Sequence, residues 1–417
     1  MHQVYWRFKR KWFYEFPPCL LALLRYRKRL QEVRVAYLER PVRVLFSVNC
    51  LAKWKMQTLL DKMKGDKRFE PVVAITIMDA ENGLPVECKK DVLASLGRFF
   101  KSQNVPVVCA YDCEKNAAVP FQDFHPDIVF YQQPWGIAKC QQPQSVARYA
   151  LTCYVPYFVV NYGGFDFDCE LLFHRVLWRH FILNELWAKA FMDDQRWYGR
   201  AGKVIATGHP MLDLFNARKG DASKKRYVIY APHWSCNTGE HFSTFLENGR
   251  LMLEFAKSHS ELNWVFKPHP TLRRTLVELC GWSAAAVDEY YSEWERIGIV
   301  CLDGNYVDLF RDSKAMITDC ASFLIEYACT GNPIIHLISS DARYRPHPIS
   351  ERLFASYYQV NNWDEFRTAL EEVVVRSNDY KRDERLANVK EMKLCDTCAA
   401  QNIVDYLDGV LSGRMLS

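Results

Sequence analysis

The sequence contains no long apolar run. No segment approaches the roughly 20 uninterrupted apolar residues that a membrane-spanning helix requires. A cleavable signal peptide is not expected either, because the apolar run at residues 19–24 is short and the basic run at residues 25–29 follows it directly. These absences argue against a membrane-spanning chain and favour a cytoplasmic protein.

Several motifs of common enzyme classes are also missing. The sequence has neither a Gly-x-Gly-x-x-Gly turn nor a glycine–lysine loop of the P-loop type, which argues against a dinucleotide oxidoreductase and against an ATPase. No Asp-x-Asp pair stands directly at the end of a predicted strand, so a divalent-metal site is not expected. The Gly-x-Ser-x-Gly elbow of the α/β-hydrolases is absent as well. No cofactor is therefore predicted.

The 15 cysteines are an odd number without a regular framework, which predicts reduced thiols in a cytosolic protein. One Cys-x-x-Cys pair, Cys395 and Cys398, is present, and Cys109 lies close to Cys113 in the sequence. A structural zinc ion requires four ligands brought together, and the second pair has poor spacing. We therefore predict no metal site and expect these cysteines to be small buried side chains.

Positive charge is concentrated near the N-terminus, although the net charge of the chain is only +5. Residues 5–40 carry ten lysines and arginines against three glutamates, and aromatic residues are interleaved with them at residues 6–16. Such a segment suits the interface of an anionic membrane, and the alternative is a solvated helix packed on its own domain. Nucleic acid would also attract it, but no nucleic-acid partner is predicted. Pro17 and Pro18 divide the segment into two pieces.

Strand and helix patterns alternate from Pro41 onward. Apolar, β-rich runs in the first half predict strands at residues 42–48, 72–78, 105–110, 128–131, 151–160 and 204–207, with helices at 51–63, 92–100 and 171–191. The polar residues 217–226 are the best candidate linker. The alternation then restarts, with strands predicted at residues 227–230, 264–266, 299–301, 315–317 and 333–338.

This alternation predicts an α/β fold of two Rossmann-like, doubly wound domains that face a cleft. The chain is expected to divide into a basic and aromatic N-terminal arm at residues 1–40, a first Rossmann-like domain at 41–218, a second at 219–385, and a C-terminal helix at 386–417. The last long helix is predicted at about residues 384–411. In such sheets, ligands bind outside the carboxyl ends of the strands.

Three strand exits in the second half carry groups that suit an anion. His233 and Ser235 follow the first of these strands, Lys267 and His269 follow the second, and residues 318–322 follow the fourth. Because parallel strand exits lie along one edge of a sheet, we expect these groups to meet around one ligand. Histidine, lysine and a helix N-terminus would together neutralise a pyrophosphate. Each histidine alone is equally compatible with a simple hydrogen-bonded turn.

The turn at residues 318–322 leads into a predicted helix that contains Glu326. Glu326 lies four residues after Ser322, so both fall on one face of that helix and could serve one ligand. Asp319 and Ser322 are also the residue types that an ordinary helix cap requires. Both interpretations stay open at this point.

These motifs resemble those of a known family. Residues 228–235, 267–270 and 317–328, together with Gly-His-Pro-Met-Leu-Asp at 208–213, look like the CDP-glycerol glycerophosphotransferases, the teichoic-acid primase and polymerase group. The resemblance covers about residues 41–340 and is strongest after residue 204. It implies a GT-B architecture, with the nucleotide-linked donor in the second domain and the acceptor against the first.

The resemblance also implies roles for individual residues. His269 and Ser322, with the turn amides near Asp319, would contact the pyrophosphate of the donor, and Glu326 would accept hydroxyls of the ribose or the polyol. His233 lies where related GT-B enzymes approach the phosphates. The predicted catalytic residues are His269, His233 and Asp166, and the predicted donor-binding residues are Lys267, Thr318, Asp319, Ser322, Glu326 and His209.

The sequence departs from the family pattern at the residue expected to act as the catalytic base. Well-studied members carry a first-domain loop whose histidine acts as the base, whereas the comparable residues 161–166 contain none. Asp166, Asp168 or His174 would have to substitute for it. In addition, Glu326 stands where the family often has aspartate, and Ala321 where serine is usual. These differences leave the identity of the polyol or sugar open.

The predicted reaction moves a polyol phosphate, glycerol phosphate first, from CDP-glycerol or a related CDP-polyol to an acceptor hydroxyl, with release of CMP. The acceptor would be a cell-surface glycan or a lipid-linked glycan in bacterial teichoic-acid or capsule synthesis. The predicted location is the cytoplasm, peripheral on the inner face of the membrane. A GT-B glycosyltransferase or epimerase-like enzyme that uses a nucleotide sugar and a non-catalytic GT-B module are the two alternatives.

Overall fold

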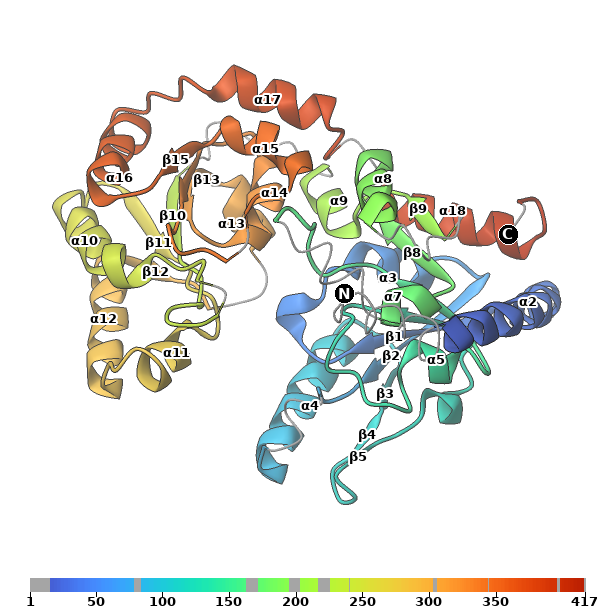
Figure 1. Cartoon of the computed structure of the whole chain (residues 1–417). Coiled ribbons are helices and arrows are strands. Elements are labelled where there is room, and N and C mark those ends of the chain that lie inside the picture. The colour runs from blue at the N-terminus through green and yellow to red at the C-terminus, as the bar shows by residue number, and fades with distance from the viewer. Residues whose placement is uncertain are drawn as a thin grey trace, which may run out of the picture. The chain divides into compact units, whose positions relative to one another are not determined.

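The computed structural model describes residues 16–78, 84–162, 172–194, 203–216, 226–239, 241–302, 306–343, 345–395 and 398–415. The chain divides into two compact units, whose elements are labelled in Figure 1. Of the described residues, unit 1 contains those up to Phe158, those of 172–213 and those of 398–415. Unit 2 contains residues 159–162 and the described residues of 214–395.

Unit 1 is built on a seven-stranded sheet in the order β3-β2-β1-β6-β7-β8-β9, with every pairing parallel. Its strands are β1 (Val42–Val48), β2 (Phe69–Ile75), β3 (Val107–Cys109), β6 (Ile128–Tyr131), β7 (Leu151–Tyr154), β8 (Arg179–Ile182) and β9 (Val204–Ala206). Every residue of β6, β7 and β8 is buried. Parallel strands are buried in this way when helices cover both faces of the sheet.

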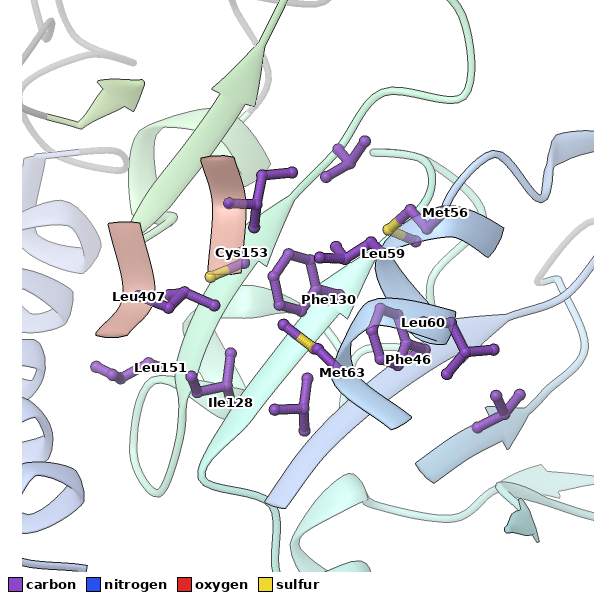
Figure 2. Close-up of a cluster of buried hydrophobic side chains, with 14 of the residues drawn as sticks. Phe46, Met56, Leu59, Leu60, Met63, Ile128, Phe130, Leu151, Cys153 and Leu407 are labelled. Atoms are coloured by element: carbon purple, nitrogen blue, oxygen red, sulfur yellow. The ribbon is translucent and has the colours of Figure 1, made fainter. Parts of the chain in front are cut away.

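Helices and one small hairpin complete unit 1. The helices are α2 (Phe16–Glu39), α3 (Gln57–Lys64), α4 (Val86–Lys101), α5 (Pro143–Val146), α7 (Leu172–Val176), α8 (Glu185–Asp194), α9 (Pro210–Asn216) and α18 (Ala399–Leu411), with 3-10 turns at Leu51–Lys53 and Phe121–Phe124. The hairpin pairs β4 (Tyr111–Asp112) with β5 (Ala117–Ala118). Figure 2 shows side chains of α3 and Leu407 of α18 gathered around Phe46 and Phe130 of the sheet.

The described part of the predicted N-terminal arm is α2, which packs on unit 1. Tyr26, Leu30 and Val33 are buried in its core, and the Tyr26 hydroxyl donates to the carbonyl of Val176 at 2.7 Å. Both prolines lie in the first turn of α2, where a missing backbone N–H breaks no hydrogen bond. Residues 16–39 therefore form a helix whose buried face packs within unit 1, and membrane binding by its exposed face stays a prediction. Residues 1–15 lie outside the described residues.

Unit 2 is built on a six-stranded parallel sheet in the order β12-β11-β10-β13-β14-β15. Its strands are β10 (Tyr227–Ala231), β11 (Asn263–Phe266), β12 (Gly298–Val300), β13 (Ser313–Thr318), β14 (Ile334–Leu337) and β15 (Tyr358–Val360). Its helices are α10 (Phe245–Ser258), α11 (Leu272–Glu278), α12 (Ala284–Ile297), α13 (Val307–Arg311), α14 (Ala321–Ala328), α15 (Pro348–Ala355), α16 (Trp363–Ala369), a π-helical turn at Leu370–Val375, and α17 (Arg382–Glu391). The two sheets confirm the predicted doubly wound α/β class.

Three predicted elements differ from the structure. The helix predicted at residues 171–191 is α7, strand β8 and α8, and the strand predicted at 151–160 ends at Tyr154, just before Pro156. The predicted final helix is α17 followed by α18, because the chain turns after residue 391 and Lys393 adopts a positive φ of 48°. The predicted C-terminal helix at 386–417 therefore falls partly in unit 2 and partly in unit 1.

One pair of cysteines is bonded. The Sγ atoms of Cys329 and Cys395 lie 2.08 Å apart, so the disulfide joins the end of α14 to the segment that follows α17. The expectation of reduced thiols throughout is wrong for this pair, which proximity in the fold brings together from positions 66 residues apart. Among the described residues, no helix is both long and apolar enough to span a bilayer.

Candidate functional site

The candidate site lies at the carboxyl edge of the unit 2 sheet. Strands β11, β10 and β13 are neighbours and run parallel, so their exits leave the sheet side by side. These exits are the three anion-compatible segments of the sequence, with His233 after β10, His269 after β11 and residues 318–322 after β13. The ring centroids of His233 and His269 are 5.4 Å apart. The sheet order therefore brings these segments together, as a doubly wound topology requires.

His233 is held as a neutral hydrogen-bond donor. The hydroxyl of Ser235 lies 2.8 Å from His233 Nδ1, and the backbone N–H of Ser235 donates to the same nitrogen at 3.3 Å. Burial and the neighbouring His269 lower the pKa of His233 to about 3. With Nδ1 accepting, the proton of the neutral ring lies on Nε2. The ring can donate this N–H to an anionic oxygen without contributing charge.

Ser235 fixes the orientation of the His233 ring. It is fully buried, and its Oγ accepts hydrogen bonds from the backbone N–H groups of Phe242 at 3.0 Å and Ser243 at 3.2 Å. Its own proton is therefore left for His233 Nδ1. His269 is turned in a similar way, because the backbone N–H of Thr271 donates to His269 Nδ1 at 3.2 Å.

Thr318 and Asp319 hold the backbone of the site. The hydroxyl of Thr318 donates to the carbonyl of Ala231 at 2.6 Å and accepts from the N–H of Cys320 at 2.9 Å. One oxygen of Asp319 accepts from the N–H of His233, and the other accepts from the N–H of Thr244 at 2.7 Å. Burial raises the pKa of Asp319 to about 6. These two side chains are thus engaged within unit 2 and position the turns that carry the histidines.

The N-terminus of α14 has no side-chain cap. Its N-cap is Cys320, whose side chain makes no capping hydrogen bond with a backbone N–H of the first turn, and that turn contains no acidic residue. Asp319 bonds elsewhere, so the interpretation of Asp319 as the cap of this helix is wrong. Ser322 is partly exposed, with its Oγ 3.2 Å from Cys320 Sγ. The uncapped amides leave partial positive charge at the same edge as His233.

Lys267, Glu326 and Tyr306 form a buried cluster in unit 2. Glu326 is 1% exposed, and its carboxylate accepts a hydrogen bond from the hydroxyl of Tyr306. Lys267 is also buried, with its Nζ 5.1 Å from the centre of the Tyr306 ring. Burial and the charge of Glu326 raise the pKa of Tyr306 well above its ordinary value. The role of Glu326 as an acceptor of ligand hydroxyls stays a prediction, because Tyr306 already occupies one of its oxygens.

Two residues from the middle of the chain contact the site, although the sequence placed them in a loop of the first domain. The side-chain amide of Asn161 donates to the carbonyl of Ala321 in the first turn of α14 at 2.6 Å. The hydroxyl of Tyr162 lies 3.0 Å from His336 Nε2, on the neighbouring strand β14. Residues 159–162 therefore belong to unit 2, although the predicted boundary assigned them to the domain at 41–218. No local pattern distinguishes this segment from a first-domain loop.

The remaining predicted residues belong to unit 1 or lie outside the described residues. His209 lies in unit 1, where its Nε2 donates to the carbonyl of Pro156 at 2.8 Å and its Nδ1 accepts from the N–H of Met211, so the ring serves the start of α9. His174 is buried in unit 1. Asp166 and Asp168 lie outside the described residues. Within the described part of the chain, no group of three metal-ligating side chains occurs.

Comparisons with known proteins identify one matching family. The family model described as CDP-Glycerol:Poly(glycerophosphate) glycerophosphotransferase matches residues 179–408. No curated protein matches the sequence.

Solved structures with a similar fold include two kinds of protein. The wall teichoic acid polymerase TagF is 11% identical, with a TM-score of 0.57 over 96% of this chain and 98% of the TagF chain. S. aureus MnaA bound to UDP is 15% identical, with a TM-score of 0.57 over 89% and 97%. UDP-GlcNAc 2-epimerase from Neisseria meningitidis is 14% identical, with a TM-score of 0.56 over 88% and 99%. These similarities show a GT-B-like fold of two Rossmann-like domains, as predicted.

Proposed function

The chain belongs to the CDP-glycerol:poly(glycerophosphate) glycerophosphotransferase family, and from this membership we propose that it transfers glycerol phosphate from CDP-glycerol to an acceptor hydroxyl. The acceptor is a hydroxyl of a cell-surface or lipid-linked glycan, and CMP is the leaving product. The TagF structures include one soaked with CDPG, which supports a donor of this kind for a similar fold.

One observation carries the proposal. The uncapped N-terminus of α14, the neutral ring of His233 and the ring of His269 lie along one edge of a parallel sheet. Backbone amides at a helix N-terminus bind phosphate oxygens. The Nε2–H of His233 adds a directed donor, and Ser322 adds a hydroxyl in the first turn of the helix. This set suits the pyrophosphate of a nucleotide diphosphate donor.

In the proposed reaction, the acceptor oxygen attacks the β-phosphorus in line and the bond from that phosphorus to the bridging oxygen of CMP breaks. Negative charge then builds on the α-phosphate of CMP, and the donors of His233, His269 and α14 stabilise it. The acceptor hydroxyl gives its proton to a base. We propose Asp166 for the base, from the region where related enzymes place theirs.

Release of CMP from CDP-glycerol in the presence of an acceptor tests the proposal. We expect His269→Ala and Ser322→Ala each to lower the rate by about a hundredfold to a thousandfold, as the loss of a transition-state donor does. His259→Ala is the matched control, because this histidine lies at the other end of α10 in unit 2. Unchanged turnover in both site variants would refute the assignment of the donor site.

A nucleotide-sugar enzyme is the second candidate. The UDP-bound MnaA and the UDP-GlcNAc 2-epimerase share the fold, and their similarity carries no information on activity at this identity. A thermal-shift screen of CDP-glycerol, CDP-ribitol, CMP and UDP-sugars separates the two candidates. Stabilisation by UDP-sugars alone would favour the second candidate, and stabilisation by none would favour a non-catalytic module.

We further propose that the enzyme works at the inner face of the membrane through α2. The outward face of this helix carries Leu20, Leu21 and Leu24, which are 44%, 48% and 52% exposed. Arg27 and Lys28 follow on the same face and are exposed as well. Apolar side chains flanked by cations suit the interface of an anionic bilayer.

A further inference from the structure

Polar side chains are also buried at the carboxyl edge of the unit 1 sheet. Strands β1 and β6 are neighbours in parallel register, with Ser47 opposite Tyr131, so Asn49 and Gln132 leave the sheet side by side. The side-chain nitrogen of Gln132 donates to the side-chain oxygen of Asn49 at 2.8 Å. This amide pair is buried on the edge where doubly wound sheets place ligands.

Gln132 has an acceptor without a partner. The side chain is 2% exposed, and within the described part of the chain its Oε1 accepts no hydrogen bond. A buried carbonyl oxygen without a donor destabilises a protein, and most such oxygens in folded proteins are satisfied. A ligand hydroxyl at this edge would supply the missing donor.

A cation and two aromatic rings lie next to the amide pair. Lys53, in the 3-10 turn after β1, donates from its Nζ to Gln133 Oε1 at 2.8 Å, and this Nζ lies 5.5 Å from the centre of the Tyr157 ring. The rings of Tyr157 and Trp135 meet edge to face with 5.9 Å between their centroids. The backbone carbonyl of Trp135 accepts a hydrogen bond from the side-chain nitrogen of Gln133 at 2.7 Å, which holds Trp135 at the same edge.

From this geometry we infer that the edge formed by Lys53, Gln132, Trp135 and Tyr157 binds a phosphorylated polyol chain, which is the acceptor of the proposed reaction. The amide oxygen of Gln132 accepts a ligand hydroxyl, and the ammonium of Lys53 attracts a ligand phosphate. The partly exposed rings offer apolar surface to the carbon side of a polyol. The acceptor role rests on the proposed function, whereas the binding chemistry does not.

Binding of a synthetic glycerol phosphate oligomer, measured by calorimetry without any nucleotide, tests the inference. We expect Lys53→Met and Gln132→Leu each to raise the Kd by about tenfold, because each removes one polar contact to the ligand. Gln122→Leu is the matched control, since this exposed glutamine of unit 1 precedes β6 at the opposite edge of the sheet. A polyol oligomer without phosphate should lose the dependence on Lys53 but keep the dependence on Gln132.

The outcomes separate this inference from the proposed function. If the oligomer does not bind, or binds both variants as well as the wild type, the inference is wrong even if CMP is released from CDP-glycerol. If binding depends on Lys53 and Gln132 but CDP-glycerol is not turned over, the binding site stands and the proposed function fails. If Gln132→Leu lowers the Tm, its weaker binding could reflect a loss of folding. Lys53→Met then tests the inference alone, because Lys53 is partly exposed and its replacement should not disturb the fold.

Discussion

The carboxylate of Asp319 accepts a hydrogen bond from the backbone N–H of His233, with 2.5 Å between Oδ1 and the nitrogen. Its second oxygen accepts from both the N–H and the hydroxyl of Thr244. One buried carboxylate thereby joins the end of β13 to the turn after β10 and to the start of α10. The position of His233 at the candidate donor site depends on this carboxylate.

We predict that Asp319 lowers stability at neutral pH while it supports activity. Burial raises its pKa from an ordinary 3.8 to about 6, so the folded state holds the proton more tightly than the unfolded state. The stabilising contribution is complete below about pH 4 and is lost as the pH rises through 6, a change of about 3 kcal/mol. Relative to the wild type, Asp319→Asn should therefore gain about this much free energy of unfolding between pH 4 and pH 7.

Urea unfolding at several pH values measures this difference, with Asp308→Asn on the surface of unit 2 as the matched control. The amide nitrogen of asparagine would face backbone donors, so the same variant should release CMP about tenfold more slowly. A difference in unfolding free energy that stays constant from pH 4 to pH 7 would contradict the raised pKa.

The hydrogen bond from Tyr306 to Glu326 supplies a second prediction. Tyr306→Phe leaves a buried carboxylate without this donor, so we expect the free energy of unfolding to fall by about 1–3 kcal/mol. A double-mutant cycle with Glu326→Gln isolates the pair, and a coupling of at least about 0.5 kcal/mol is expected. Independent, additive effects of the two substitutions would show that the two side chains do not support each other.

Much of this architecture was predictable because the strands that carry the candidate donor site contain continuous apolar runs. Strands β10, β11 and β13 have clear boundaries in the sequence, and their exits could be placed on one edge from topology alone. Strand β8 was missed because Arg179 and His180 interrupt its apolar pattern, although both are buried in the fold. Burial of these polar side chains depends on neighbours that no local pattern reveals.

The contacts that organise the site were less predictable, since they join distant parts of the chain. Asn161 contacts Ala321 across 160 positions, and Tyr306, which precedes α13, contacts Glu326 on α14. Asp319 fits the sequence pattern of a helix cap, and only its contacts with His233 and Thr244 reveal a different use. Residue types at a strand exit predicted an anion site, but not which side chains face a ligand.

A third prediction concerns the bond between Cys329 and Cys395. Their separation of 66 residues closes a long loop, and loss of such a disulfide typically lowers the free energy of unfolding by about 2–4 kcal/mol. Cys395→Ser and a reducing agent should therefore lower the Tm of the wild type by similar amounts. Cys398→Ser, at an exposed free cysteine, should leave the Tm unchanged. A wild-type Tm that does not respond to reductant would argue against the disulfide.

The last prediction concerns binding of α2 to membranes. Leu20, Leu21 and Leu24 are about half exposed on its outward face, so replacing all three with serine removes apolar surface that a bilayer would bury. We expect the variant to bind vesicles at least about tenfold more weakly, measured by co-sedimentation. Leu246→Ser, at a leucine of unit 2 that is 44% exposed, is the matched control.

Substitution of the charged residues of α2 distinguishes binding to an anionic membrane from non-specific hydrophobic adsorption. Arg27→Gln with Lys28→Gln should weaken binding to vesicles that contain anionic lipid by about thirtyfold, since each cation near such a surface contributes about 1 kcal/mol. Binding to neutral vesicles should not change, because the electrostatic attraction requires a charged surface, and salt should mimic the substitution. Equal binding of all variants to anionic vesicles would mean that the leucines of α2 do not contact the bilayer, and that another surface or a protein partner covers them.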